Sequence, residues 1–107
     1  MAHYLVRARL KVGIANELRQ RISNEEFLSM RPFGKSLTRS MNGLRHDPNT
    51  DEVLWEEEDY CSPPLAMERS AVLDKYFDDI RVESLPAGEG WERISDLPAL
   101  WDDIHKP

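Results

Sequence analysis

The sequence predicts a single α+β domain with one antiparallel sheet, and three observations lead to this fold class. The chain has 107 residues, which fits one domain. Short segments with alternating apolar residues flank two segments in which apolar residues have helical spacing. The charge also changes along the chain, because residues 1–46 carry nine basic and three acidic residues, whereas residues 47–107 carry five basic and seventeen acidic residues. The two halves attract each other if the fold interleaves them.

The first predicted strand covers residues 3–10, and Gly13 ends it. Apolar residues alternate with more polar ones along this segment, as expected for a strand with one buried face. We expect the face with Tyr4, Val6 and Ala8 to contact the helices. The opposite face then carries the side chains of His3, Leu5, Arg7 and Arg9.

Residues 14–28 have the pattern of an amphipathic helix, because apolar residues recur every four positions from Ile14 to Ile22. Asn16 is a candidate N-cap, since its side chain can accept a hydrogen bond from a free backbone N–H of the first turn. The segment 29–34 (SMRPFG) contains a proline and a glycine and is expected to end the helix.

Residues 35–45 alternate loosely, with Leu37 and Met41 on one side, and we interpret them as a half-exposed edge strand. Residues 46–52 (HDPNTDE) are rich in turn-forming residues. Residues 53–61 follow as the next strand. Together these segments predict a β-hairpin.

The segment Ser62-Pro63-Pro64 predicts the start of a second helix, because serine can cap a helix and proline is tolerated in its first turn. We expect this helix to run to Phe77. Residues 80–85 form a short strand with Ile80 and Val82 on one face, and Pro86 ends it.

The resulting order β-α-β-β-α-β is that of a ferredoxin-like domain, which we assign to residues 1–86. It predicts a four-stranded antiparallel sheet with both helices on one face. The first and third strands are neighbours at the centre of such a sheet. We therefore expect Arg7 and Arg9 to lie beside the acidic run Glu56–Glu58.

Residues 87–107 fall outside this pattern and are predicted to form a C-terminal arm with a short helix. Ser95 is the expected N-cap of that helix, with Pro98 in its first turn. We expect the arm to pack on the domain or on a partner subunit through its apolar residues, which are Trp91, Ile94, Leu97, Leu100 and Trp101.

The uncovered face of the sheet is the predicted place for a polar ligand-binding cleft, because carboxylates beside arginines can orient a ligand or exchange protons. The pattern leaves open which side of strand 53–61 faces the helices: one side carries Glu57 and Asp59, and the other carries Glu56, Glu58 and Tyr60. The alternative interpretation is a set of structural cross-strand ion pairs. The candidate ligand-binding residues are His3, Arg7, Arg9, Arg39, Glu57 and Asp59.

Other kinds of site have weaker support. Cys61 precedes a predicted helix, whose N-terminus can stabilise a thiolate, but a small half-buried cysteine at the end of a strand is the favoured interpretation. One cysteine excludes an intrachain disulfide and a cysteine-rich zinc site, and the three histidines lack metal-ligand spacing. Residues 47–58 resemble a calcium loop but lack its glycine. We therefore expect no metal and no cofactor.

The net charge of −6 argues against nucleic acid and anionic membranes as partners, since both require a basic surface. No apolar run reaches the length of a membrane span, and the N-terminus lacks the pattern of a signal peptide. We expect a cytoplasmic protein. Phosphate-binding glycine loops, nucleophile elbows and HExxH helices are also missing from the sequence.

The βαββαβ pattern over residues 3–85 resembles the dimeric α+β barrel superfamily. That resemblance implies two protomers that pack sheet to sheet, with ligands held in clefts beside the sheets. Its members include small monooxygenases, isomerases and ligand-sensing domains. We therefore expect a homodimeric ligand-binding or structural protein, possible ligands being small anions. The alternatives are a small cofactor-free enzyme and an interaction module whose acidic Glu56–Asp59 edge meets a basic partner.

Overall fold

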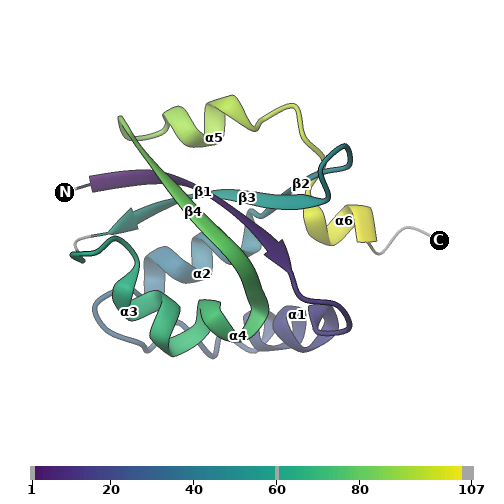
Figure 1. The fold of residues 1–107 in the computed structure, drawn as a ribbon. Coiled ribbons are helices and arrows are strands. Elements are labelled where there is room, and N and C mark those ends of the chain that lie inside the picture. Colours follow the sequence, from purple (N-terminus) through teal and green to yellow (C-terminus); the bar gives the residue numbers. More distant parts are fainter. Residues whose placement is uncertain (1, 60, 105–107) are drawn as a thin grey trace.

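The computed structural model describes residues 2–59 and 61–104, which form an α+β fold around one open antiparallel sheet (Figure 1). Its four strands are β1 (Ala2–Leu10), β2 (Arg45–Asp47), β3 (Glu52–Asp59) and β4 (Phe77–Leu85), in the order β2-β3-β1-β4. The central pairing of β1 with β3 confirms the prediction that the first and third strands are neighbours. Strand β4 forms one edge of the sheet, and the three-residue strand β2 forms the other.

Helices cover one face of the sheet (Figure 1). They are α1 (Ala15–Ser23), α2 (Gly34–Asn42) and a continuous helical segment made of α3 (Ala66–Glu68), the π-helical turn η1 (Arg69–Leu73) and α4 (Asp74–Tyr76). The main core lies between these helices and the sheet, as the alternation in the first strand predicted. Its central side chains include Val6, Ala8, Val53, Trp55, Leu18, Leu37, Met41, Leu73 and Tyr76.

The C-terminal arm packs on its own chain. Helix α5 (Glu89–Arg93) lies on the opposite side of the sheet from α1–α4 (Figure 1). There Ile94 joins Leu5 and Leu54 in a second apolar cluster. Helix α6 (Leu100–Ile104) lies beside β2, and the indole Nε1 of Trp101 donates a hydrogen bond of 2.7 Å to the Met41 carbonyl. The second face of the sheet is therefore covered over β1 and β3.

The prediction of an edge strand over residues 35–45 is wrong, because most of this segment forms helix α2. Leu37 and Met41 lie four positions apart, a spacing that satisfies one strand face and one helix face equally well. The predicted hairpin is present but shorter than expected, because its first strand, β2, contains only Arg45–Asp47 before the turn into β3. Gly34 begins α2 instead of ending the preceding helix.

The predicted helix boundaries also differ from the structure. Helix α1 ends at Ser23, so residues 24–28 are turns, and none of the three proposed capping side chains of Asn16, Ser62 and Ser95 acts as an N-cap. Ser95 instead follows α5 and donates its hydroxyl to the Glu92 carbonyl at 2.8 Å. The N-cap positions of α1, α3 and α5 are instead Ile14, Leu65 and Gly88, none of which makes a side-chain cap hydrogen bond.

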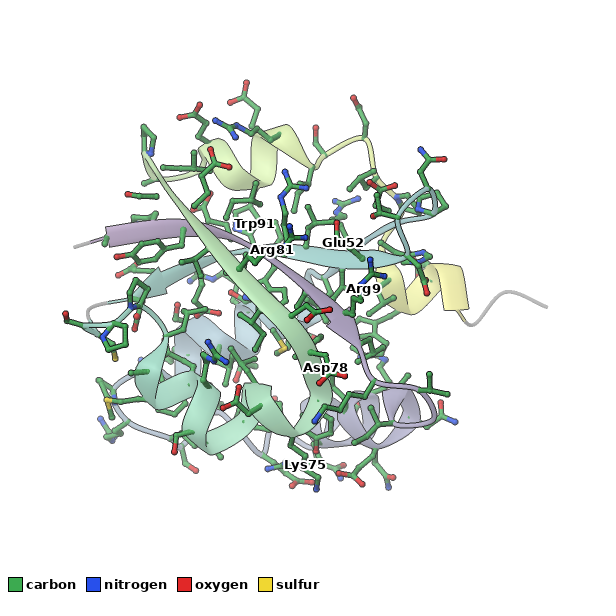
Figure 2. All side chains as sticks on the ribbon, in the orientation of Figure 1. Arg9, Glu52, Lys75, Asp78, Arg81 and Trp91 are labelled. Carbon is green, nitrogen blue, oxygen red and sulfur yellow. The ribbon has the colours of Figure 1, made fainter. Side chains whose placement is uncertain are left out.

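The expected pairing of Arg7 and Arg9 with the acidic run is wrong as well. The register places Arg7 opposite Leu54, and it is His3 that lies opposite Glu58. The Arg9 side chain instead donates to the Thr50 carbonyl at 3.1 Å and lies 3.7 Å from the Asp79 carboxylate. On the same side of the sheet, Arg81 forms an ion pair with the buried Glu52 (Figure 2). The basic and acidic halves do interleave, but through different residues.

Candidate functional site

A pocket of about 520 Å³ lies at the end of β3, where α2 and α3 meet the sheet. This size is within the range of small-molecule sites in proteins. Its wall combines apolar, cationic, acidic and thiol groups. The lining residues are Pro32, Phe33, Lys35, Ser36, Arg39, Glu58, Asp59, Cys61, Met67 and Glu68.

Helix α2 supplies the cationic side of the pocket. Lys35 and Arg39 are four positions apart and Ser36 lies between them, so one helix face presents all three side chains. The opposite face of α2 is anchored in the core by Leu37 and Met41. Within the part of the chain that the structure describes, neither Lys35 nor Arg39 forms an ion pair. Both cations are exposed and available to a bound anion.

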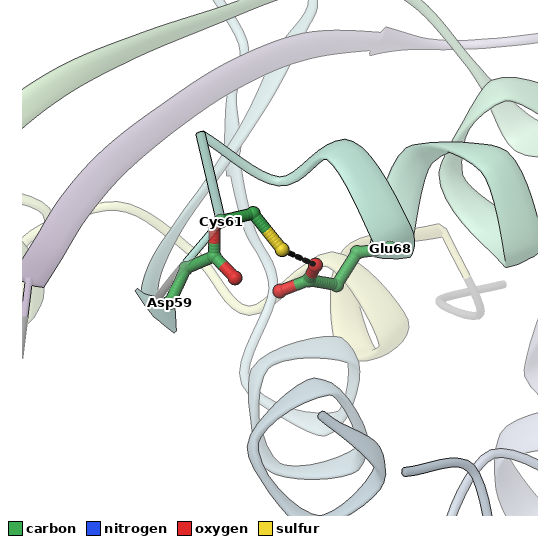
Figure 3. Close-up of side chains that lie close together, drawn as sticks. All are labelled: Asp59, Cys61 and Glu68. Atoms are coloured by element: carbon green, nitrogen blue, oxygen red, sulfur yellow. Dashed lines mark hydrogen bonds between the residues drawn. The ribbon is translucent and has the colours of Figure 1, made fainter. Parts of the chain in front are cut away.

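The inner end of the pocket brings together Asp59 from the end of β3, Cys61 from the following loop and Glu68 from α3 (Figure 3). One ligand atom from each of these residues lies within 4.8 Å of the others. The Cys61 Sγ is 3.8 Å from Glu68 Oε1. Glu68 is completely buried, yet its Oε2 has no hydrogen-bond partner among the described residues.

A tight turn before α3 positions this cluster. Leu65 has a left-handed backbone with φ of 66°, and its buried side chain joins the main core. Its backbone N–H donates to Asp59 Oδ2 at 2.5 Å, which fixes the first turn of α3 against the end of β3. Glu68 follows one turn of helix later and is thereby directed towards the pocket.

Glu57 lies behind the pocket wall and is fully buried on the helix side of β3. Its carboxyl accepts hydrogen bonds from the indole of Trp55 at 3.0 Å and the hydroxyl of Ser36 at 3.1 Å. Desolvation by burial, with a contribution from the nearby Glu68, raises the pKa of Glu57 to about 8. This carboxyl therefore holds its proton at neutral pH.

The same environment acts on the inner cluster. Burial and a hydrogen bond with the Asp59 carboxyl raise the pKa of Glu68 to about 7. For Cys61, a backbone hydrogen bond to Met67 favours the thiolate, but desolvation and the neighbouring Asp59 outweigh it, so its pKa is raised. The sequence-based idea of a helix-activated Cys61 thiolate is therefore not supported.

The structure divides the sequence-predicted site residues among different places. Arg39 and Asp59 line the pocket, and Glu57 lies just behind it. The open question about β3 is settled, because Val53 and Trp55 share the helix side with Glu57 and Asp59. The uncovered-face cleft predicted for Glu57 and Asp59 is thus on the wrong side of the sheet. Tyr60, the alternative candidate, lies outside the described residues.

Arg7, Arg9 and His3 do not line this pocket. His3 nevertheless lies close to it, because its Nε2 is 3.9 Å from Oε2 of the lining residue Glu58, and it borders a small cavity of about 40 Å³ together with Ser36, Arg39 and Glu58. His3 Nδ1 is 3.2 Å from Glu56 Oε2 on the arm side of the sheet. Glu56 also accepts hydrogen bonds from the backbone N–H groups of Gly88, Gly90 and Trp91, at 2.9, 2.8 and 3.2 Å. These contacts anchor the arm, which gives Glu56 a structural role.

The acidic run does not form an exposed edge. Glu56, Glu57 and Asp59 are 6%, 0% and 4% exposed, and the side chain of Glu58 is 35% exposed. A basic protein partner therefore finds little of this run at the surface, which weakens the interaction-module hypothesis.

Sequence reasoning missed Glu68, Lys35, Ser36 and the apolar wall of Phe33 and Met67. Assigning residues 35–45 to a strand separated Lys35 and Arg39, which belong to one helix face. Glu68 was missed because its position in the predicted amphipathic helix resembles that of an ordinary exposed polar residue. A detectable signal was the four-residue spacing of Lys35 and Arg39.

Comparison with protein-family models gave no match, and searches of curated proteins and of solved structures gave none either. Within residues 2–59 and 61–104, no helix has the length and apolar character needed to cross a lipid bilayer. The function is therefore argued from the geometry of the site.

Proposed function

We propose that the protein binds a small organic anion in the pocket between α2, α3 and the end of β3. The observation that carries this proposal is the pocket of about 520 Å³ with Lys35 and Arg39 on one wall. Phe33 and Met67 provide apolar surface for the organic part of the ligand. Such a mixture of apolar walls and a few convergent polar groups is typical of small-molecule sites.

Of the three acidic residues in the lining, Glu68 opposes an anionic ligand least. Glu68 lies at the inner end of the pocket, and its raised pKa of about 7 reduces its negative charge at neutral pH. The anionic group is placed at the α2 side, where the guanidinium of Arg39 can bind a carboxylate or phosphate with two hydrogen bonds.

The test is a thermal-shift screen of small aromatic and aliphatic carboxylates, phosphates and sulfonates, followed by calorimetry on the best ligand. We expect at least one ligand to stabilise the protein, and the double variant K35A/R39A to lose that shift. The matched control K75A/R93A also removes two exposed cations, but away from the pocket, and should keep it. Equal loss in both double variants would mean that only general charge attraction was measured.

We further propose that the domain is ferredoxin-like and forms a homodimer. The strand order with β1 and β3 at the centre supports the first part. Helix α5 occupies the face over β1 and β3, which opposes sheet-to-sheet packing of two copies there, and we place the contact instead at the edge strand β4. Antiparallel pairing of two β4 strands about Val82 sets Arg81 opposite Glu83 of the other copy, which makes the edge self-complementary.

Light scattering tests the dimer at micromolar concentration. The wild-type protein should have twice the chain mass of 12.4 kDa. V82K should shift the mass towards the monomer, because Val82 is 41% exposed on β4. V12K introduces the same charge at a fully exposed valine outside the strand and should leave the mass unchanged. A wild-type mass of 12.4 kDa would reject the dimer without affecting the pocket.

A cofactor-free enzyme is the second candidate function, favoured by the buried Glu68 carboxyl in the pocket lining. A carboxyl in contact with a bound ligand can act as a general acid or base. Solvent-deuterium exchange into the ligand, followed by NMR, separates the two functions. Exchange that needs Glu68, while E68Q still binds the ligand, would indicate catalysis; binding without exchange would indicate a binding protein.

A further inference from the structure

The inner end of the pocket has the composition of a metal site. Asp59, Cys61 and Glu68 offer two carboxylates and one sulfur, with their ligand atoms within 4.8 Å of one another (Figure 3). Two different structural segments supply these atoms, because Asp59 and Cys61 flank the end of β3 and Glu68 belongs to α3. The Asp59–Leu65 hydrogen bond holds these segments together without any metal.

Glu68 provides a second and independent indication. Its side chain is 0% exposed and lines the pocket, and its Oε2 has no hydrogen-bond partner among the described residues. No ion pair of the described residues involves it. A buried carboxylate oxygen without a partner is costly, and a bound cation removes that cost.

We propose that Asp59, Cys61 and Glu68 bind a divalent transition-metal ion, with Zn²⁺ as the best match. This proposal departs from the sequence-based expectation of no metal, which considered histidine spacing, cysteine number and a calcium loop at residues 47–58, but no mixed site of carboxylates and one cysteine. Zn²⁺ accepts mixed sulfur and carboxylate ligands in tetrahedral geometry, whereas Mg²⁺ and Ca²⁺ prefer oxygen ligands alone. Bond lengths of about 2.3 Å to sulfur and about 2.1 Å to oxygen imply a ligand separation of about 3.6 Å. The Cys61–Glu68 distance of 3.8 Å is close to this value.

Three protein ligands leave one tetrahedral position open towards the pocket. Three protein ligands plus an exchangeable group is the arrangement of catalytic and ligand-binding zinc sites, whereas structural sites use four protein ligands. The open position would receive water or the anionic group of a bound ligand. This part of the inference rests on the proposed anion binding, but metal binding itself does not.

The test uses the full-length, untagged protein, freed of metal with EDTA and then titrated with Co²⁺ as a spectroscopic substitute for Zn²⁺. We expect one equivalent to bind and to produce a thiolate-to-cobalt charge-transfer band in the near ultraviolet, which added Zn²⁺ removes. C61S should lose the band. E68Q removes a proposed ligand and should weaken Co²⁺ binding by at least the roughly tenfold that loss of a group merely supporting a ligand causes. E92Q, which removes an exposed carboxylate from α5, should bind as the wild type does.

Binding without the charge-transfer band, or equal affinity in wild type and E68Q, would overturn the metal site. Circular dichroism of each variant excludes loss of the fold as the cause of weaker binding. Repeating the anion screen in EDTA and with Zn²⁺ separates the two proposals. If an anion binds in EDTA through Lys35 and Arg39 but Co²⁺ does not bind, only the metal site is rejected. If Co²⁺ binds but no anion does, only the proposed anion binding is rejected.

Discussion

At the scale of single residues, the buried carboxyls of β3 have opposite roles. Glu56 accepts hydrogen bonds from three backbone N–H groups of the arm. Glu57 instead accepts hydrogen bonds from the side chains of Trp55 and Ser36, and burial raises its pKa to about 8. Adjacent strand residues face opposite sides of the sheet, so one glutamate fixes the arm and the other borders the pocket. Glu56 and Glu57 are adjacent in the sequence, but their side chains therefore belong to two separate parts of the structure.

Glu57 predicts a specific pH dependence of stability. Its pKa is about 8 in the folded protein and near the ordinary 4.5 in the unfolded chain, so the folded state holds an extra proton between these values. The free energy of unfolding should fall as the pH rises through this window, by up to ~1.4 kcal/mol per pH unit from this group. E57Q lacks this term, so its stability relative to wild type should increase from pH 5 to pH 8.

Urea denaturation in EDTA-containing buffer measures the free energy of unfolding of both proteins. The value for E57Q minus the value for wild type should be lowest near pH 5 and rise towards pH 8. Parallel pH profiles of wild type and E57Q would show that Glu57 ionises normally and that burial does not control its proton.

Glu56 predicts a loss of stability localised to the arm. E56A leaves the N–H groups of Gly88, Gly90 and Trp91 without their acceptor, and the expected cost is about 1–3 kcal/mol. Hydrogen exchange should show increased opening of α5. D74N, at an exposed ion pair with Arg69, should change stability by less than about 0.5 kcal/mol. Similar effects of the two substitutions would contradict the anchoring role.

At the scale of elements, helix α2 determines the pocket, and its start depends on Gly34. A Cβ at this position would lie 2.5 Å from the carbonyl oxygens of both Phe27 and Leu28, so only glycine allows this close approach. G34A should therefore destabilise the protein by about 2 kcal/mol or more, measured by urea denaturation. N42A, at an exposed position of the same helix, should have little effect. Wild-type stability of G34A would mean that α2 begins differently.

The elements also show how far sequence reasoning reaches. Strand β1 was predicted with the correct faces, because Tyr4, Val6 and Ala8 recur at every second position while the charged Arg7 and Arg9 lie on the other face. Helix α2 was not predicted, because the spacing of Leu37 and Met41 fits both the two-residue repeat of a strand and the 3.6-residue repeat of a helix. Gly34 was also interpreted as a helix breaker. Pairing of Arg7 and Arg9 failed because strand register depends on contacts between distant segments. The pocket required correct placement of both α2 and α3, so its residues were found only in part.

At the scale of the whole molecule, the two faces of the sheet have different roles. One face carries the helices, the main core and the pocket, and the other is covered over β1 and β3 by the arm (Figure 1). We propose that ligands bind on the helix face, at the end of β3. The predicted cleft on the arm-covered face is the direct competitor of this site, because His3 lies there.

The most direct test is an NMR titration of ¹⁵N-labelled protein with the best anion from the screen. Our account predicts that amide shifts concentrate in residues 33–39 and 61–68, with small changes at His3 and Trp91. Shifts that concentrate at His3, Gly88 and Trp91, or along β4, would contradict it and place the ligand on the other face of the sheet.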